Sequence, residues 1–194
     1  MARKAKRAVP QGSEPRPRRR ATAVASEGRL VLAEGPATSR LFVYMAGNYI
    51  HRIERERREL YAGDLSLALV AEIIGTAAIE PGMRDAAFRK KHQHFDTPVS
   101  VQDQRGTNAT SISISAGIPR ETVRRKIDQL LKMGLIVEKE PARYVIKSGV
   151  LLEPHRQAAY ARGIDQTLRF MNELLDHGAV RWVPAPKGKR GTGR

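Results

Sequence analysis

Hydrophobic residues recur with helical spacing in two long segments at the start of the patterned part of the chain. In residues 40–61 one apolar stripe has a four-residue repeat, formed by Leu41, Met45, Tyr49 and Ile53. Residues 65–79 are apolar on nearly every side, and Gly63 and Asp64 precede them as a helix stop and an N-cap. The pattern predicts an amphipathic helix and then a core helix that is buried on most of its faces.

A second pattern, in residues 108–133, predicts two short helices joined by a sharp turn. Gly117 supplies the backbone freedom of the turn, and Pro119 suits the first position of the second helix. The second helix has one apolar stripe, made of Val123, Ile127, Leu130 and Leu131. The opposite side of the same helix is polar and largely basic. This arrangement is typical of a helix-turn-helix, and an ordinary corner between two helices is the alternative interpretation.

The residues after this pair of helices alternate between apolar runs and turn formers. Gly134 ends the second helix, and residues 135–137 and 144–146 are β-prone runs on either side of a turn at 138–143. Pro154 then opens an amphipathic helix that extends to about residue 177. Residues 80–106 show no clear periodicity, although Pro81-Gly82 predicts a break in the chain.

The order helix, turn, helix, glycine and hairpin resembles that of the winged helix-turn-helix transcriptional regulators of bacteria. The resemblance covers residues 105–147 and is carried by the segment GIPRETVRRKIDQLLKMGLI. It implies a mainly α fold with a small β-hairpin wing. The expected organisation is a winged helix-turn-helix domain at 38–152, with its helix-turn-helix at 108–133 and wing at 135–147, followed by a C-terminal helix at 153–178 that is a candidate for dimerisation.

The resemblance also implies double-stranded DNA as the partner, with the second helix in the major groove. Arg120, Glu121 and Arg124 are then expected to read base edges, and the helix N-terminus at Pro119 favours an approaching phosphate. The expected phosphate and wing contacts are those of Thr122, Arg125, Lys126, Lys139 and Arg143. Glu138 and Glu140 add acidic charge to the wing.

The net charge of +15 is concentrated at the two ends of the 194-residue chain. Residues 1–20 contain eight Lys or Arg and one Glu, and residues 181–194 contain five Lys or Arg and no acid. We expect disordered basic arms at 1–37 and 179–194, because their Pro, Gly and Ala content does not support a core. Basic arms of this kind bind polyanions such as nucleic acids; the alternative is that they only increase solubility.

Several other kinds of site are not indicated by the sequence. There is no cysteine, and His92, His94 and Asp96 lack the spacing of zinc motifs. No phosphate loop or nucleophilic triad stands out, so we expect neither an enzyme, a metal nor a cofactor. The apolar run at 65–79 is too short for a bilayer and contains Glu72, so no membrane is expected.

The sequence thus predicts a bacterial, cytoplasmic and nucleoid-associated regulator that binds specific DNA sequences. The helices at 40–61 and 154–177 exceed what a winged helix needs, which favours a homodimer over helices that cover only their own domain. The alternatives are a winged helix that binds protein, or a basic protein that binds nucleic acid without sequence preference.

Overall fold

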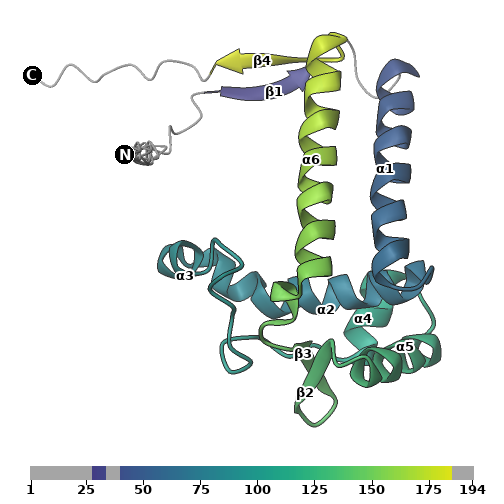
Figure 1. Ribbon diagram of the computed structural model, residues 1–194, viewed down its shortest axis with the longest axis vertical. Helices are drawn as coiled ribbons and strands as arrows, with labels where there is room; N and C mark the ends of the chain where they lie inside the picture. Colours follow the sequence, from purple (N-terminus) through teal and green to yellow (C-terminus); the bar gives the residue numbers. More distant parts are fainter. Residues whose placement is uncertain (1–27, 34–39, 185–194) are drawn as a thin grey trace, which may run out of the picture. The chain divides into compact units, whose positions relative to one another are not determined.

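The computed structural model describes residues 28–33 and 40–184. The chain divides into two units, Leu32–Arg181 and a second unit formed by Met1–Val31 and Trp182–Arg194. The larger unit is mainly helical and contains a small antiparallel sheet of two strands, which confirms the predicted fold class at that level (Figure 1). The elements in chain order are β1 (Gly28–Leu32), α1 (Arg40–Leu60), α2 (Leu65–Arg84), α3 (Ala86–Lys91), α4 (Ala109–Ala116), α5 (Arg120–Lys132), β2 (Ile136–Glu140), β3 (Arg143–Ile146), the 3-10 turn η1 (Val150–Leu152), α6 (Pro154–Asp176) and β4 (Val180–Pro184).

The long helices α1 and α6 lie side by side in opposite directions (Figure 1). The Tyr49 ring stacks on Phe170 with ring centroids 4.6 Å apart, and the Tyr49 hydroxyl is hydrogen-bonded to Thr167 at 3.0 Å. Farther along the same pair of helices, the Arg162 Nε donates to Glu56, which is buried, at 2.6 Å. Both predicted outer helices are therefore present, and they pack on each other.

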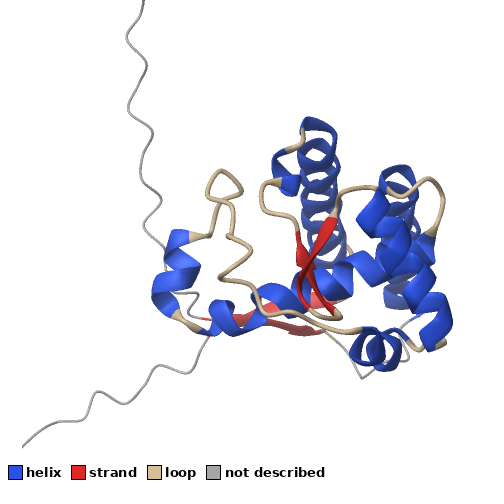
Figure 2. Cartoon of the chain, turned by 90° about the horizontal axis from the view of Figure 1, so that it is seen from below, coloured by secondary structure: helices blue, strands red, loops and turns tan. Residues whose placement is uncertain are grey.

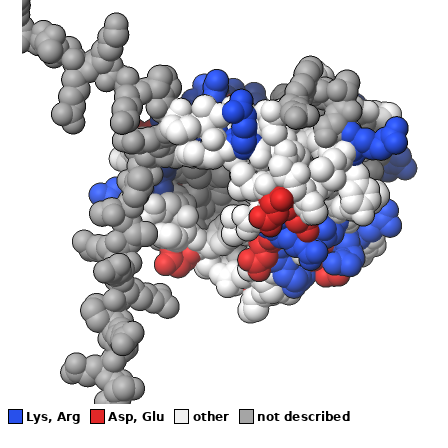
Figure 3. Space-filling model, turned by 90° about the horizontal axis from the view of Figure 1, so that it is seen from above, with Lys and Arg blue, Asp and Glu red and all other residues white. Residues whose placement is uncertain are grey.

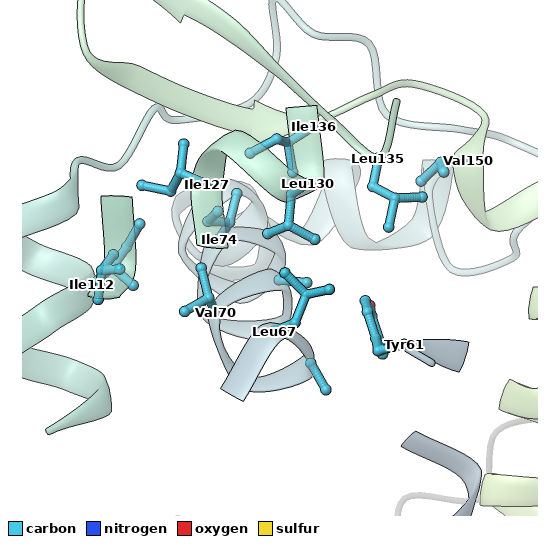
Figure 4. Close-up of a cluster of buried hydrophobic side chains, with 13 residues drawn as sticks. Tyr61, Leu67, Val70, Ile74, Ile112, Ile127, Leu130, Leu135, Ile136 and Val150 are labelled. Carbon is cyan, nitrogen blue, oxygen red and sulfur yellow. The ribbon is translucent and has the colours of Figure 1, made fainter. Parts of the chain in front are cut away.

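Helix α2 is the centre of the hydrophobic core. The carboxylate of Asp64 accepts the Leu67 N–H at 2.9 Å and so caps the helix as predicted. Val70 and Ile74 are fully buried, and Figure 4 shows them among the core side chains of the neighbouring elements. The remaining labelled members of this core are Tyr61, Leu67, Ile112, Ile127, Leu130, Leu135, Ile136 and Val150.

Helix α2 continues through Pro81, and the predicted break at Pro81-Gly82 is wrong. Proline lacks the N–H of a helical hydrogen bond, but Pro81 lies in the last turn, where only a short stretch of helix follows. The nearby carbonyl of Ala78 accepts the Arg105 N–H at 2.9 Å. The helix instead ends at Arg84, and the carboxylate of the next residue, Asp85, caps α3 by accepting the Phe88 N–H at 2.7 Å.

Helix α2 is also long and apolar enough to cross a bilayer. Among the described residues, no other helix meets this criterion of length and composition. The buried side chains of α2 pack against α4, α5 and β3 of the same unit. These contacts are compatible with the core helix of a soluble protein.

Helices α4 and α5 meet at a left-handed turn. Gly117 has a φ of 65°, a left-handed backbone conformation that is unfavourable for residues with a Cβ. Glycine therefore suits the predicted corner. The Asn108 side chain caps α4 by accepting the Ser111 N–H at 2.9 Å. Pro119 lies one position earlier than predicted, at the N-cap of α5, where its carbonyl accepts the Val123 N–H at 3.0 Å.

The hairpin β2–β3 is antiparallel and pairs Ile136 with Ile146 and Val137 with Val145. The hairpin and α5 are both seen in Figure 2, which views the chain from below. An isolated bridge from Thr107 extends the pairing on the outer side of β3. Gly106, just before it, lies so close to the hairpin that an added Cβ would come within 2.8 Å of the Arg143 Cβ.

The segment between α3 and α4, which showed no periodicity, is anchored on this hairpin by one buried side chain. The amide of Gln104 donates to the Ile146 carbonyl at 2.9 Å and accepts the Ile146 N–H at 3.0 Å. This pairing is the kind that a neighbouring strand would supply. A side chain therefore gives order to a loop that lacks secondary structure.

The strands β1 and β4 pair with each other, so the prediction of disorder is wrong for these residues of the two arms. The Trp182 ring lies against Gly28, where an added Cβ would come within 2.6 Å of it. Each strand is short and its partner is far away in the sequence, which is why no local pattern revealed the pair. The other residues of the predicted arms, 1–27, 34–37 and 185–194, lie outside the described residues.

Candidate nucleic-acid interface

Helix α5 presents an apolar side to the core and a charged side to solvent. Val123 and Leu130 are completely buried and Ile127 is 2% exposed, so the apolar side is fully used in packing. On the other side, Arg120, Glu121, Arg124 and Arg125 are exposed. The predicted recognition residues therefore share one accessible face of α5, with Pro119 exposed at its N-terminal end.

The charged groups of this face contact one another only weakly. The Arg124 guanidinium lies 3.6 Å from the Glu121 carboxylate, and both side chains are more than half exposed. Arg125 donates to the Thr122 hydroxyl at 3.3 Å. Exposed pairs of this kind contribute roughly 0.2–1 kcal/mol. These side chains can therefore exchange their partners for a ligand at little cost.

Lys126 differs from its neighbours because it points to the core side of the face. Its Nζ donates to the carboxylate of Asp64 in a short ion pair, and its side chain is only 18% exposed. The hydrogen bond from Lys126 is the main reason that the pKa of Asp64 is lowered. Lys126 thus connects α5 to the N-terminus of α2, and this contact argues against its expected role as a phosphate ligand.

The two basic residues predicted in the hairpin are also unequal. Lys139 Nζ donates to the carbonyls of Gln102 at 2.9 Å and Gln104 at 2.8 Å, so it holds the long loop against β2. Arg143 donates to the Gly106 carbonyl at 3.3 Å and remains exposed. Of the two, Arg143 is the residue whose charge is available to a ligand.

Asp128 is a further exposed residue of the α5 face, and it was not among the predicted contact residues. Its spacing from Glu121 and Arg124, seven and four residues, places the three on one side of the helix and could have revealed it. Burial is the largest reason that the pKa of Tyr144 is raised, and the negative charges of Glu138 and Asp128 add to it. The hairpin and the α5 face therefore lie within electrostatic reach of each other.

Figure 3 shows acidic and basic side chains that adjoin each other on the face of the chain seen from above. Among the described residues, no group of three His, Asp or Glu side chains is placed to hold a metal ion. In the cluster His92, His94 and Asp96, the Nδ1 of His92 lies 3.0 Å from the Thr97 carbonyl. The three residues thus give no support to a metal centre.

Comparisons of the chain with models of known families, with curated proteins and with solved structures find no match. The geometry of α5 and its surroundings therefore carries the argument for function.

Proposed function

We propose that the chain is a sequence-specific DNA-binding regulator of transcription in which α4, α5 and β2–β3 form a winged helix-turn-helix. One observation carries the proposal: the apolar face of α5 is buried and packs against α2 and α4, whereas the arginine face of the same helix is exposed to solvent. A helix held in this way can enter the major groove without loss of core packing.

The chemistry of the exposed face favours base reading over phosphate contact alone. Arg120 and Arg124 can each pair bidentately with guanine, and the carboxylates of Glu121 and Asp128 can accept from cytosine N4. Acidic groups in the middle of the face disfavour indiscriminate binding to phosphates. Arg143 on the hairpin is then available to contact the DNA phosphate backbone beside the major groove. The proposed activity is binding and not catalysis, and its place is the bacterial cytoplasm, on the nucleoid.

The proposal extends to a homodimer formed through α6. Phe170 of α6 stacks on Tyr49 of α1 and Leu174 is buried, yet a second apolar stripe on α6 stays exposed. The members of this α6 stripe have the spacing i, i+4, i+7 and i+11 and are Ile164, Leu168, Met171 and Leu175. A two-fold axis along such a stripe would present two α5 helices to paired half-sites.

The test is a selection from a random pool of double-stranded DNA with the full chain at 150 mM salt. We expect a selected sequence whose affinity exceeds that of a scrambled duplex of the same composition by at least about a thousandfold. Equal affinities for the two duplexes would leave a protein that binds nucleic acid without preference. Absence of DNA binding at low salt would favour a winged helix that contacts protein.

A further inference from the structure

A cavity of about 440 Å³ opens beside the core, between α2, the loop after α3, the segment after β3 and the start of α6. Its volume falls within the range of small-molecule sites, about 300–1,000 Å³. Tyr61, Leu135 and Val150, which Figure 4 shows in the core, contribute to its wall. The rings of Phe95 and Tyr160 also line it, with their centroids 5.8 Å apart. The wall is predominantly apolar, so it suits the hydrocarbon body of an organic molecule.

Among the described residues, three Lys, Arg, Asp or Glu side chains line the cavity, and two of them already have partners. Glu72 pairs with Arg57 at 2.8 Å. Arg156 is buried, and its Nε donates to Glu153 at 2.8 Å. The third, Lys147, is exposed, and its ammonium has no ion pair or hydrogen bond within the described part of the chain. The charge that the cavity offers to a ligand is therefore positive.

The main chain of Lys147 is fixed beside the apolar wall, whereas its side chain remains free to move. Its N–H donates to the Leu135 carbonyl at 3.0 Å, and its carbonyl accepts the Val150 N–H at 3.3 Å. Both partners belong to the hydrophobic core and also line the cavity. A lysine ammonium is a compact charge on a flexible stem of four carbons. It can therefore turn toward an anionic group at the opening of the cavity without disturbing the wall.

We propose that this cavity binds an apolar monocarboxylate, whose hydrocarbon body lies against the wall and whose carboxylate pairs with the Lys147 Nζ. Burial of the apolar body supplies affinity, and one charge-assisted hydrogen bond fixes the orientation of the ligand. The two basic ends of the chain carry the same sign of charge as Lys147, which disfavours them as occupants. Helix α5 contributes no residue to the described lining, so the inference does not depend on DNA binding.

The probe for this site is 1-naphthaleneacetate, titrated calorimetrically against the full chain at pH 8, where histidine side chains are ordinarily neutral. We expect saturable binding of one molecule per chain. Thr76→Phe, which enlarges an exposed lining residue of α2, should weaken binding by at least about tenfold. Ser66→Phe is the matched control, because Ser66 is exposed on the same helix outside the cavity, and it should bind as the wild type does. Non-saturable binding, or unchanged binding in Thr76→Phe, would overturn the cavity as the site.

The contribution of the charge is tested with 1-naphthaleneacetamide, which has nearly the same shape as the probe and no charge. The wild type should prefer the acetate by about fivefold, the upper value for a partly exposed ion pair. Lys147→Gln should remove this preference, and Lys147→Arg should keep it. Lys132→Gln is the matched control, because Lys132 is exposed on α5 outside the cavity, and it should also keep the preference.

Three results would overturn the assignment of Lys147 as the partner of the carboxylate. The first is equal affinity of the wild type for the acetate and the amide. The second is a preference for the acetate that persists in Lys147→Gln. The third is the same loss of preference in Lys132→Gln, which would attribute the effect to the net charge of the chain.

Discussion

Asp64 provides a quantitative test of how α5 is held, because its carboxylate has two separate functions. It caps α2 through the Leu67 N–H, and it pairs with Lys126 of α5. Asp64→Asn keeps an oxygen for the cap and removes the charge. Asp64→Ala removes both interactions. The two variants therefore separate the contribution of the cap from that of the contact between helices.

The expected losses follow from the exposure of the pair. Lys126 is mostly buried and Asp64 about one-third exposed, so loss of the charge pairing in Asp64→Asn should cost about 1 kcal/mol of unfolding free energy. Loss of the cap as well should add about 1 kcal/mol in Asp64→Ala. Asp85→Asn is the matched control, because Asp85 caps α3 and makes no ion pair within the described residues. It should be nearly neutral.

The assay is urea unfolding monitored by circular dichroism at several pH values. The pKa of Asp64 is lowered in the folded protein, so its charge stabilises the fold above the unfolded-state pKa, and this stability is lost as pH falls through the folded value. The difference between wild type and Asp64→Asn should be full at pH 6 and shrink below about pH 4. A difference independent of pH, or equal losses for Asn and Ala, would refute the two roles.

Further predictions concern assembly and the basic arm. Leu168→Glu should yield a folded monomer with a sedimentation mass near 21.6 kDa, because Leu168 is 54% exposed, whereas the wild type should sediment at twice that mass. Met45→Glu should instead unfold the chain, because Met45 is only 5% exposed within the monomer and a charge there would be buried; a folded Met45→Glu monomer would contradict this. Deletion of residues 1–20 should leave the selected DNA sequence unchanged. The slope of log K against log salt should become less steep by about 0.9 for each phosphate that the arm neutralises in the intact protein. Identical slopes would mean that these charges do not bind DNA.

The local features of the fold could be predicted because they depend on neighbours in the sequence. Asp64 and Gly117 act within one helical turn of their own positions, and the structure places them at the N-cap of α2 and at the corner after α4, as predicted. The two outer helices were likewise predictable from their repeated apolar positions. Local periodicity therefore located nearly every helix that contributes to the core.

The features that could not be predicted depend on residues far apart in the sequence. Lys126 and Asp64 are brought together only by the packing of α5 on α2. Gln104 replaces a strand neighbour of β3 through its side chain, which no periodicity encodes. For Lys126, the helical spacing in the sequence gives the direction of the side chain. It does not show that Asp64 lies in that direction and pairs with Lys126, so the expected contact with phosphate gains no support.

The measurement that tests the central claim most directly compares Arg124→Ala with Lys132→Ala on every single-base substitution of the selected DNA site. Both residues are exposed on α5, but Lys132 lies at the C-terminal end, away from the proposed base contacts. We expect Arg124→Ala to lose about 1–3 kcal/mol and to stop discriminating at one base position, with Lys132→Ala retaining the full preference. An unchanged base preference in Arg124→Ala, or the same uniform loss in both variants, would contradict the assignment of α5 as the recognition helix.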